Sequence, residues 1–186
     1  MKTSYKINIA GLERELPLFK INEDLYIGAF IMFGDVEITK HSAEKLLSLA
    51  PQYDIMITAE CKSIPLIYEM ARQTNAENYI IARKAQKLYM KNIVSTTVDS
   101  ITTANTQNLC IGEADALAMK GKRVLIVDDV ISTGESLAAI EKLVSAAGGE
   151  IVGKMAVLAE GDAQAREDIT YLAPLPLFDK DGNPIK

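Results

Sequence analysis

From residue 55 onward, short aliphatic runs alternate with segments whose apolar residues recur at helical spacing. The segment 64–74 has this spacing, and so does 135–147, which is followed by the helix-stopping pair Gly148 and Gly149. Uninterrupted aliphatic strands separated by amphipathic helices are typical of a parallel sheet covered by helices. The pattern therefore predicts an α/β fold with a central, mostly parallel sheet flanked by helices. The predicted strands are residues 55–59, 79–82, 124–127 and 151–158.

The first fifty residues predict smaller elements that could cap one end of this sheet, and we call that cap the hood. We expect a strand near residues 5–9, a strand or loop at 25–33, and a helix around 42–50 that ends before Pro51. The C-terminal stretch 171–178 is too rich in proline for a central strand, so we expect it along an edge.

Between residues 83 and 121 the pattern changes. Serine and threonine alternate with aliphatic residues over 93–109, as in a β-hairpin with one exposed face. We interpret this segment as a mobile arm. Because 186 residues correspond to about one domain, we predict a single domain over 1–186. It would comprise a hood (about 1–50 plus the C-terminal segment), a core (about 51–160) and a flexible arm (about 84–110).

Composition excludes several classes of protein. Twenty Lys and Arg against 25 Asp and Glu give a net charge of −5, so we expect no nucleic-acid partner and no binding to anionic membranes. No apolar run approaches the ~20 residues of a membrane span, and the N-terminus lacks a secretory signal. The two cysteines form no spaced pattern, which favours a cytoplasmic protein with reduced thiols. His41 is the one histidine, which argues against a structural zinc site or a histidine-based triad.

The strongest candidate site is the segment 124–136. Four aliphatic residues lead into Asp128 and Asp129, which we place at the carboxyl end of a buried strand, where ligands of open parallel sheets bind. Adjacent carboxylates repel each other unless a cation or a diol is bound between them. They suit vicinal hydroxyls or a hard cation such as Mg²⁺. A solvated strand end is the plainer interpretation, but it leaves this crowding unexplained.

A hydroxyl- and glycine-containing turn follows the acidic pair and precedes a helix. Exposed N–H groups at a helix N-terminus attract phosphate, and a glycine permits its close approach. Helix capping alone would account for Ser132 and Thr133, but the ordered combination of acids, turn and helix favours a phosphorylated sugar. The predicted phosphate site, which the resemblance described next assigns to a 5′-phosphate, is Ser132, Thr133, Gly134, Glu135 and Ser136.

Over its full length, 124–136 resembles the signature of the type I phosphoribosyltransferases for 5-phosphoribosyl pyrophosphate (PRPP). A Walker-type loop is excluded because no Gly-Lys-Ser/Thr follows the turn. The resemblance covers roughly residues 24–178 and looks closest to the adenine and xanthine phosphoribosyltransferases. It implies that Asp128 and Asp129 are catalytic and hold the ribose hydroxyls, directly or through water on Mg²⁺.

The resemblance also implies a pyrophosphate site in two loops that follow core strands. Cations at strand ends could hold a pyrophosphate leaving group by charge-assisted hydrogen bonds, although any one of them taken alone could be an ordinary solvated side chain. The implied residues are Glu60, Cys61, Lys62 and Ser63 in the first loop and Arg83, Lys84 and Lys87 in the second.

The activity implied by the resemblance is transfer of the phosphoribosyl group of PRPP to a purine base, adenine before others, with release of pyrophosphate and with Mg²⁺ as cofactor. The arm would close over the site to exclude water, and relatives suggest a homodimer. In the arm, 98–103 lacks the glutamate of adenine-specific relatives and offers Asp99 as its carboxylate. Two alternatives stay open: a non-catalytic PRPP-binding regulator, and a transferase for xanthine, guanine or orotate.

Overall fold

The computed structural model describes residues 2–98 and 107–185. Its centre is a five-stranded sheet in the order β10-β9-β8-β4-β5, and every neighbouring pair is parallel. This confirms the predicted α/β fold. The strands are β4 (Ile55–Ala59), β5 (Ile80–Ala82), β8 (Arg123–Ile131), β9 (Glu150–Glu160) and β10 (Thr170–Leu175).

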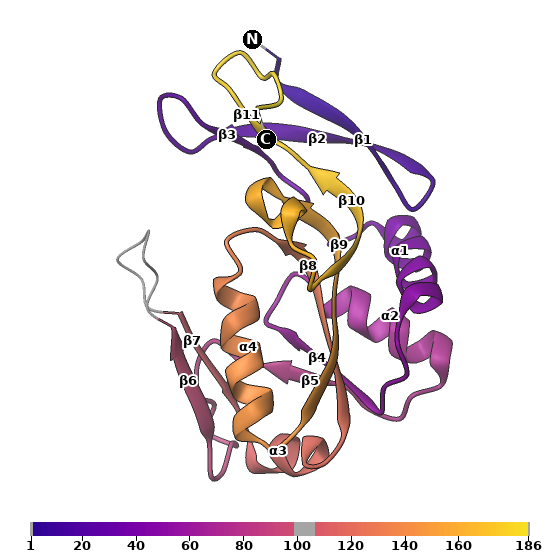
Figure 1. Cartoon of the computed structure of the whole chain (residues 1–186), viewed down its shortest axis with the longest axis vertical. Helices are drawn as coiled ribbons and strands as arrows, with labels where there is room; N and C mark the ends of the chain where they lie inside the picture. Colours follow the sequence, from indigo (N-terminus) through magenta and orange to yellow (C-terminus); the bar gives the residue numbers. More distant parts are fainter. Residues whose placement is uncertain (1, 99–106, 186) are drawn as a thin grey trace.

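Helices cover both faces of this sheet, because alternate residues of each buried strand point to opposite sides. Ile57 and Ile126 pack with α4 (Glu135–Ala146), whereas Met56 and Leu125 pack with α1 (Val36–Leu49) and α2 (Ile64–Thr74). Figure 1 shows α1 and α2 on one side of the sheet and α4 on the other. The aliphatic runs of the sequence are therefore strands buried on both faces.

The hood is a four-stranded sheet in the order β1-β2-β3-β11. Its strands are β1 (Ser4–Ile9), β2 (Leu12–Lys20), β3 (Tyr26–Gly28) and β11 (Leu177–Phe178). The strand β10 forms the edge of the central sheet, as predicted from the proline content of 171–178. The chain then enters the hood, where Phe178 is fully buried and contacts the ring of Tyr5. The hood therefore lies at the end of the molecule toward which β8, β9 and β10 run (Figure 1).

The predicted hairpin is present as β6 (Val94–Val98) and β7 (Gln107–Ile111). Leu109 and Ile111 are buried in the core cluster that contains α4, and the Thr96 hydroxyl donates to the Ala139 carbonyl at 3.2 Å. The hairpin thus packs on the outer face of α4 (Figure 1). Asp99 and the rest of 99–106 lie outside the described residues.

Two element boundaries differ from the prediction. The helix expected at 42–50 begins at Val36, because the Asp35 carboxylate caps it by accepting from the Ile38 N–H at 3.0 Å. Its first turns contain β-branched residues, which weaken the helical signal. The strand expected at 124–127 continues to Ile131, since its pairing with β9 extends past the acids. Asp128 and Asp129 therefore lie inside a strand and not after it.

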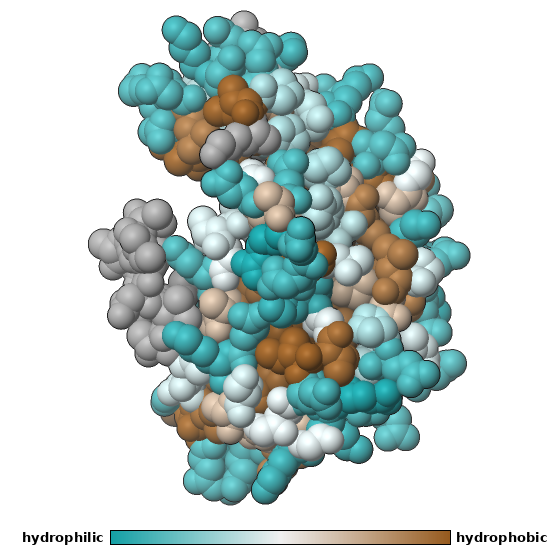
Figure 2. Space-filling view, in the orientation of Figure 1, coloured by the Kyte–Doolittle hydropathy of each residue, from teal (hydrophilic) through white to brown (hydrophobic). Residues whose placement is uncertain are grey.

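Two elements had no clear sequence signal. The strand β2 contains Pro17, which opposes a strand assignment, and α3 (Glu113–Met119) is only 7 residues long. Hydrophilic side chains dominate the face of the molecule in Figure 2, where hydrophobic ones form separate patches. In the part of the chain that the structure describes, no helix is long and apolar enough to cross a membrane.

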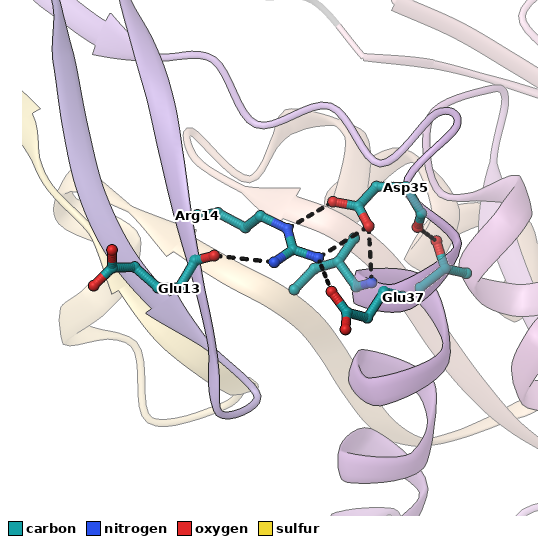
Figure 3. Close-up of polar contacts among 6 residues, drawn as sticks. Glu13, Arg14, Asp35 and Glu37 are labelled. Atoms are coloured by element: carbon teal, nitrogen blue, oxygen red, sulfur yellow. Dashed lines mark hydrogen bonds and ion pairs between the residues drawn. The ribbon is translucent and has the colours of Figure 1, made fainter.

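One arginine joins the hood to the core. The Arg14 guanidinium donates through Nε to Asp35 Oδ2 at 2.7 Å, and through Nη2 to Asp35 Oδ1 at 3.1 Å and to Glu37 at 2.8 Å (Figure 3). Asp35 Oδ1 also caps α1 by accepting from the Ile38 N–H. The contact with Arg14 therefore fixes β2 against the start of that helix. The bonds from Arg14 hold the pKa of Asp35 below its usual value.

We therefore predict that Arg14→Met lowers the free energy of unfolding by about 1–2 kcal/mol, because a partly buried, bidentate charged contact is lost. Since the pKa of Asp35 is lowered in the folded protein, this difference should be complete above about pH 4 and shrink as the pH falls further. Urea unfolding at several pH values measures it. The exposed Lys6–Glu13 pair of the same hairpin provides the control Lys6→Met, for which we expect less than about 0.5 kcal/mol. Equal effects of the two variants would contradict this role for Arg14.

Candidate active site

The turn between β8 and α4 encloses a small cavity of about 90 Å³. The strand ends at Ile131, α4 begins at Glu135, and Gly134 joins them with a φ of +82°. The N–H groups of the first turn of α4 have no carbonyl partners within the helix, which makes the turn suitable for an anion. All the predicted phosphate residues are gathered here, and the lining consists of Asp128, Val130, Ile131, Ser132, Thr133, Gly134, Glu135, Ser136 and Leu137.

Gly134 is favoured at this position chiefly by its backbone conformation. Its positive φ is unfavourable for residues with a Cβ, and a Cβ built there would lie 2.7 Å from Nη1 of Arg166. Arg166 is held in place by Asp168, which accepts from its Nε at 2.9 Å and its Nη2 at 2.8 Å. Sequence reasoning did not identify Arg166, since it lies 32 residues after the turn and outside any motif.

The Ser132 hydroxyl lies next to the Glu160 carboxylate, at the carboxyl end of the neighbouring strand β9. Burial raises the pKa of Glu160 above its usual value, and the nearby Ser132 opposes the rise. That this hydroxyl donates to a phosphate stays a prediction, and Glu160 is a further acceptor near it. Glu160 is a second polar residue of the site that the motif did not reveal, although its place at the end of a core strand is a usable signal.

The acidic pair has two different environments. Asp128 Oδ1 accepts from the Ser63 hydroxyl at 2.9 Å and from the Asp129 N–H at 2.9 Å, while Ser63 in turn accepts from Thr58 at 2.8 Å. Burial and the neighbouring Asp129 raise the pKa of Asp128 to about 7. The residue Asp129 is only 3% exposed. Its Oδ2 makes no hydrogen bond within the described chain, and Lys62 Nζ lies 3.1 Å away as an ion pair.

The loop between β4 and α2 faces the acidic pair across a second cavity, of about 300 Å³. This loop holds Glu60, Cys61, Lys62 and Ser63, and its Glu60–Cys61 peptide bond is cis. The two cavities are contiguous, because Asp128, Val130 and Ser136 line both. The lining of the second cavity is Ala59, Glu60, Cys61, Lys62, Ser63, Lys84, Asp128, Asp129, Val130 and Ser136.

The second predicted pyrophosphate loop is tied to the first by Glu60. Its Oε2 accepts from the Lys84 N–H at 3.1 Å and lies 3.6 Å from Arg83 Nε. Because a carboxylate repels pyrophosphate, this geometry favours a positioning role for Glu60. Arg83 and Lys87 do not line either cavity, unlike Lys84. Arg83 exchanges backbone hydrogen bonds with Cys110 of β7, both at 2.8 Å.

A larger cavity, of about 490 Å³, lies between α1 and α2, away from the acidic pair. Both of its acidic residues are already paired, since Glu69 accepts from Arg72 of the same lining at 2.8 Å and Asp35 accepts from Arg14, which lies outside the lining. It contains none of the predicted site residues. Most of the residues that the sequence predicts for the site therefore lie near the carboxyl ends of β4 and β8, where ligands of parallel sheets bind.

Comparison with known proteins identifies the family. The model of the phosphoribosyl transferase domain matches residues 36–174, which include both cavities' linings. An adenine phosphoribosyltransferase of Petrotoga mobilis is 29% identical over 164 residues, covering 87% of this chain and 86% of the relative. A hypoxanthine/guanine phosphoribosyltransferase of Methanococcus voltae is 33% identical over 113 residues, covering 61% of this chain and 56% of the relative.

The fold is likewise shared with a solved structure. The crystal structure of adenine phosphoribosyltransferase from Rhodothermus marinus superposes with a TM-score of 0.64 at 21% identity, covering 93% of this chain and 94% of that one. A central parallel sheet flanked by helices is thus common to both. The chain belongs to the phosphoribosyl transferase domain family and is a glycosyl-transferring enzyme of that family, similar to adenine phosphoribosyltransferases.

Proposed function

We propose that this protein transfers the 5-phosphoribosyl group of PRPP to a purine base, with adenine as the favoured base, and releases pyrophosphate. One observation carries the proposal: a phosphate-sized turn, two carboxylates and a cationic loop surround two contiguous cavities at the ends of parallel strands. These groups match the phosphate, diol and pyrophosphate of PRPP. The similarity to the Petrotoga enzyme favours adenine, and the Methanococcus relative makes hypoxanthine and guanine the second candidates.

Each part of the donor has a complementary group. The N-terminus of α4, with the Thr133 and Ser136 hydroxyls, would hold the 5′-phosphate. Asp128 and Asp129 would accept from the ribose hydroxyls, while Lys62 and Lys84 would neutralise the pyrophosphate as its bond to the sugar breaks. A nitrogen of the base would form the new bond to the same sugar carbon and would lose its proton to water or to the released pyrophosphate. The stabilisation is electrostatic, because positive charge develops on the sugar and negative charge on the leaving group.

The acidic pair fits a magnesium ion. The buried Asp129 Oδ2 has no hydrogen bond, and hard carboxylate oxygens are preferred ligands of Mg²⁺. Among the described residues, no group of three or more potential ligands gathers, so water and the substrate's own oxygens would complete the shell. Bound there, Mg²⁺ would supply further neutralisation of the pyrophosphate.

The cellular context belongs to the same proposal. A purine phosphoribosyltransferase would act in nucleotide salvage in the cytoplasm, and the resemblance to family members favours a homodimer. Arg83, Lys87 and the described part of the arm would approach the substrate as the arm closes and excludes water.

The direct test is an assay of the pure protein with PRPP, Mg²⁺ and each of adenine, hypoxanthine, guanine, xanthine and orotate. We expect pyrophosphate release with adenine, at a kcat/KM at least about tenfold above that for the other bases, which corresponds to about 1.4 kcal/mol in the transition state. Release with none of these bases would overturn the proposed reaction. PRPP-dependent thermal stabilisation without product would then favour the regulatory alternative.

We predict that Asp129→Asn lowers kcat/KM for Mg²⁺-PRPP by about 100-fold, because the carboxylate that faces the ribose and the cation is lost. Folding should be preserved, since the variant also removes repulsion from Asp128. Thermal unfolding and steady-state kinetics measure the two effects. The exposed carboxylate of Asp24 supplies the control Asp24→Asn, which should change neither. Parallel losses of melting temperature and activity would instead make Asp129 structural.

We predict that Gly134→Ala raises KM for PRPP by about tenfold or more, because the methyl group distorts the turn that surrounds the phosphate. It should also lower stability by about 1–3 kcal/mol through strain at positive φ. Gly11→Ala is a matched control, since Gly11 has a φ of +86° and nothing within 4 Å of its built Cβ. That variant should lose stability only. An unchanged KM in Gly134→Ala would contradict the phosphate-binding role of this turn.

A further inference from the structure

The ion pair between Lys62 and Asp129 joins an exposed loop to a buried carboxylate. The side chain of Asp129 is 4% exposed and that of Lys62 is 50% exposed. A flexible lysine thus extends from the β4–α2 loop to Asp129 Oδ2, the oxygen that makes no hydrogen bond within the described residues. Both residues line the cavity proposed for the sugar and the pyrophosphate.

Charge balance explains why the lysine lies there. Asp128 and Asp129 carry consecutive carboxylates. Asp128 already accepts hydrogen bonds from the Ser63 hydroxyl and from a backbone N–H. The negative charge of Asp129 needs a cation, because a buried, unpaired carboxylate is costly. Lys62 is the cation that the structure places within 4 Å of it, in the part of the chain that is described. Its ammonium group therefore lies against the same oxygen that we propose as a ligand of Mg²⁺.

We propose that Lys62 is a resident cation that keeps free divalent metal away from Asp129 and gives up that position only when Mg²⁺ arrives with PRPP. This inference rests on the proposed function, because it names how the same site takes its donor. Lys62 and Mg²⁺ exclude each other at Oδ2, since two cations on one oxygen repel. When the pyrophosphate enters, it provides Lys62 with a new anion in the same cavity, and Asp129 becomes available to the ribose and the metal.

A lysine suits this exchange better than an arginine would. An ammonium group is a compact charge on a flexible stem, whereas a guanidinium is a rigid fork that favours one fixed bidentate partner. The exposure of Lys62 leaves its stem free to turn from Asp129 to a ligand in the cavity. Lys84 lines the same cavity, but the contact that the structure records for it is its backbone N–H on Glu60. Lys62 therefore differs from its neighbour by its pairing with the buried acid.

The test measures Mg²⁺ binding in the absence of PRPP, by thermal unfolding of the full chain with and without MgCl₂. In Lys62→Met the vacated oxygen should take the metal, so the melting temperature should rise by about 3 °C at a concentration roughly ten times Kd. The wild-type protein and Lys84→Met should shift by less than about 1 °C at the same concentration. Lys84→Met removes the same charge from the same cavity, and it controls for general attraction of Mg²⁺ to an acidic protein.

Two further variants complete the design. The double variant Lys62→Met/Asp129→Asn should lose the Mg²⁺-dependent shift, because the metal would bind at Asp129. Lys62→Gln removes the same charge and replaces Lys62→Met if that variant folds poorly, and we expect the same Mg²⁺-dependent shift from it. Equal Mg²⁺-dependent shifts in the wild-type protein, Lys62→Met and Lys84→Met would overturn the proposal. The absence of a shift in both Lys62→Met and Lys62→Gln would also overturn it. The Mg²⁺-dependent shift in melting temperature needs no turnover, so its outcome is independent of the transferase assay. Failure of this inference and failure of the proposed function can therefore be told apart.

Discussion

Two carboxylates side by side in a buried parallel strand set the main electrostatic constraint on this molecule. The ladder between β8 and β9 holds Asp128 and Asp129 in the sheet, so neither can turn away into solvent as a loop residue could. The fold meets their charge with a hydroxyl relay from Thr58 through Ser63 on one side and with Lys62 on the other. The β4–α2 loop supplies both Ser63 and Lys62 and so contacts both acids.

The same constraint explains which parts of the site the sequence could predict. Residues within one motif are adjacent in the chain, so the acids and the turn from Ser132 to Ser136 could be recognised from local order, and the structure gathers them around one cavity. Glu160 and Arg166 reach that turn from a different strand and from the segment after it. Their contribution depends on tertiary contact, which no local spacing encodes.

The elements of the fold also differ in how well the sequence predicts them. Strands buried on both faces have a strong signal, because their aliphatic runs are continuous, and β4, β8 and β9 are present where expected. The sequence signal for a helix or a strand was weak where the local conformational preference of the residues disagrees with their tertiary contacts. The start of α1 is rich in β-branched residues but is fixed by the Asp35 cap and its contact with Arg14, and β2 forms despite Pro17 because its partners in the hood complete the sheet.

Pairing within the site also bears on what kind of ligand it selects. Lys62 is matched by Asp129, Arg83 by Glu60, and the Ser132 hydroxyl by Glu160. A simple anion would have to compete with these carboxylates for each donor and would leave the buried Asp129 without a partner. A ligand that carries phosphate groups together with hydroxyls and a cation can replace both halves of each pair at once. This pairing of donors with carboxylates therefore favours a phosphorylated sugar bound with its metal over inorganic phosphate or pyrophosphate alone.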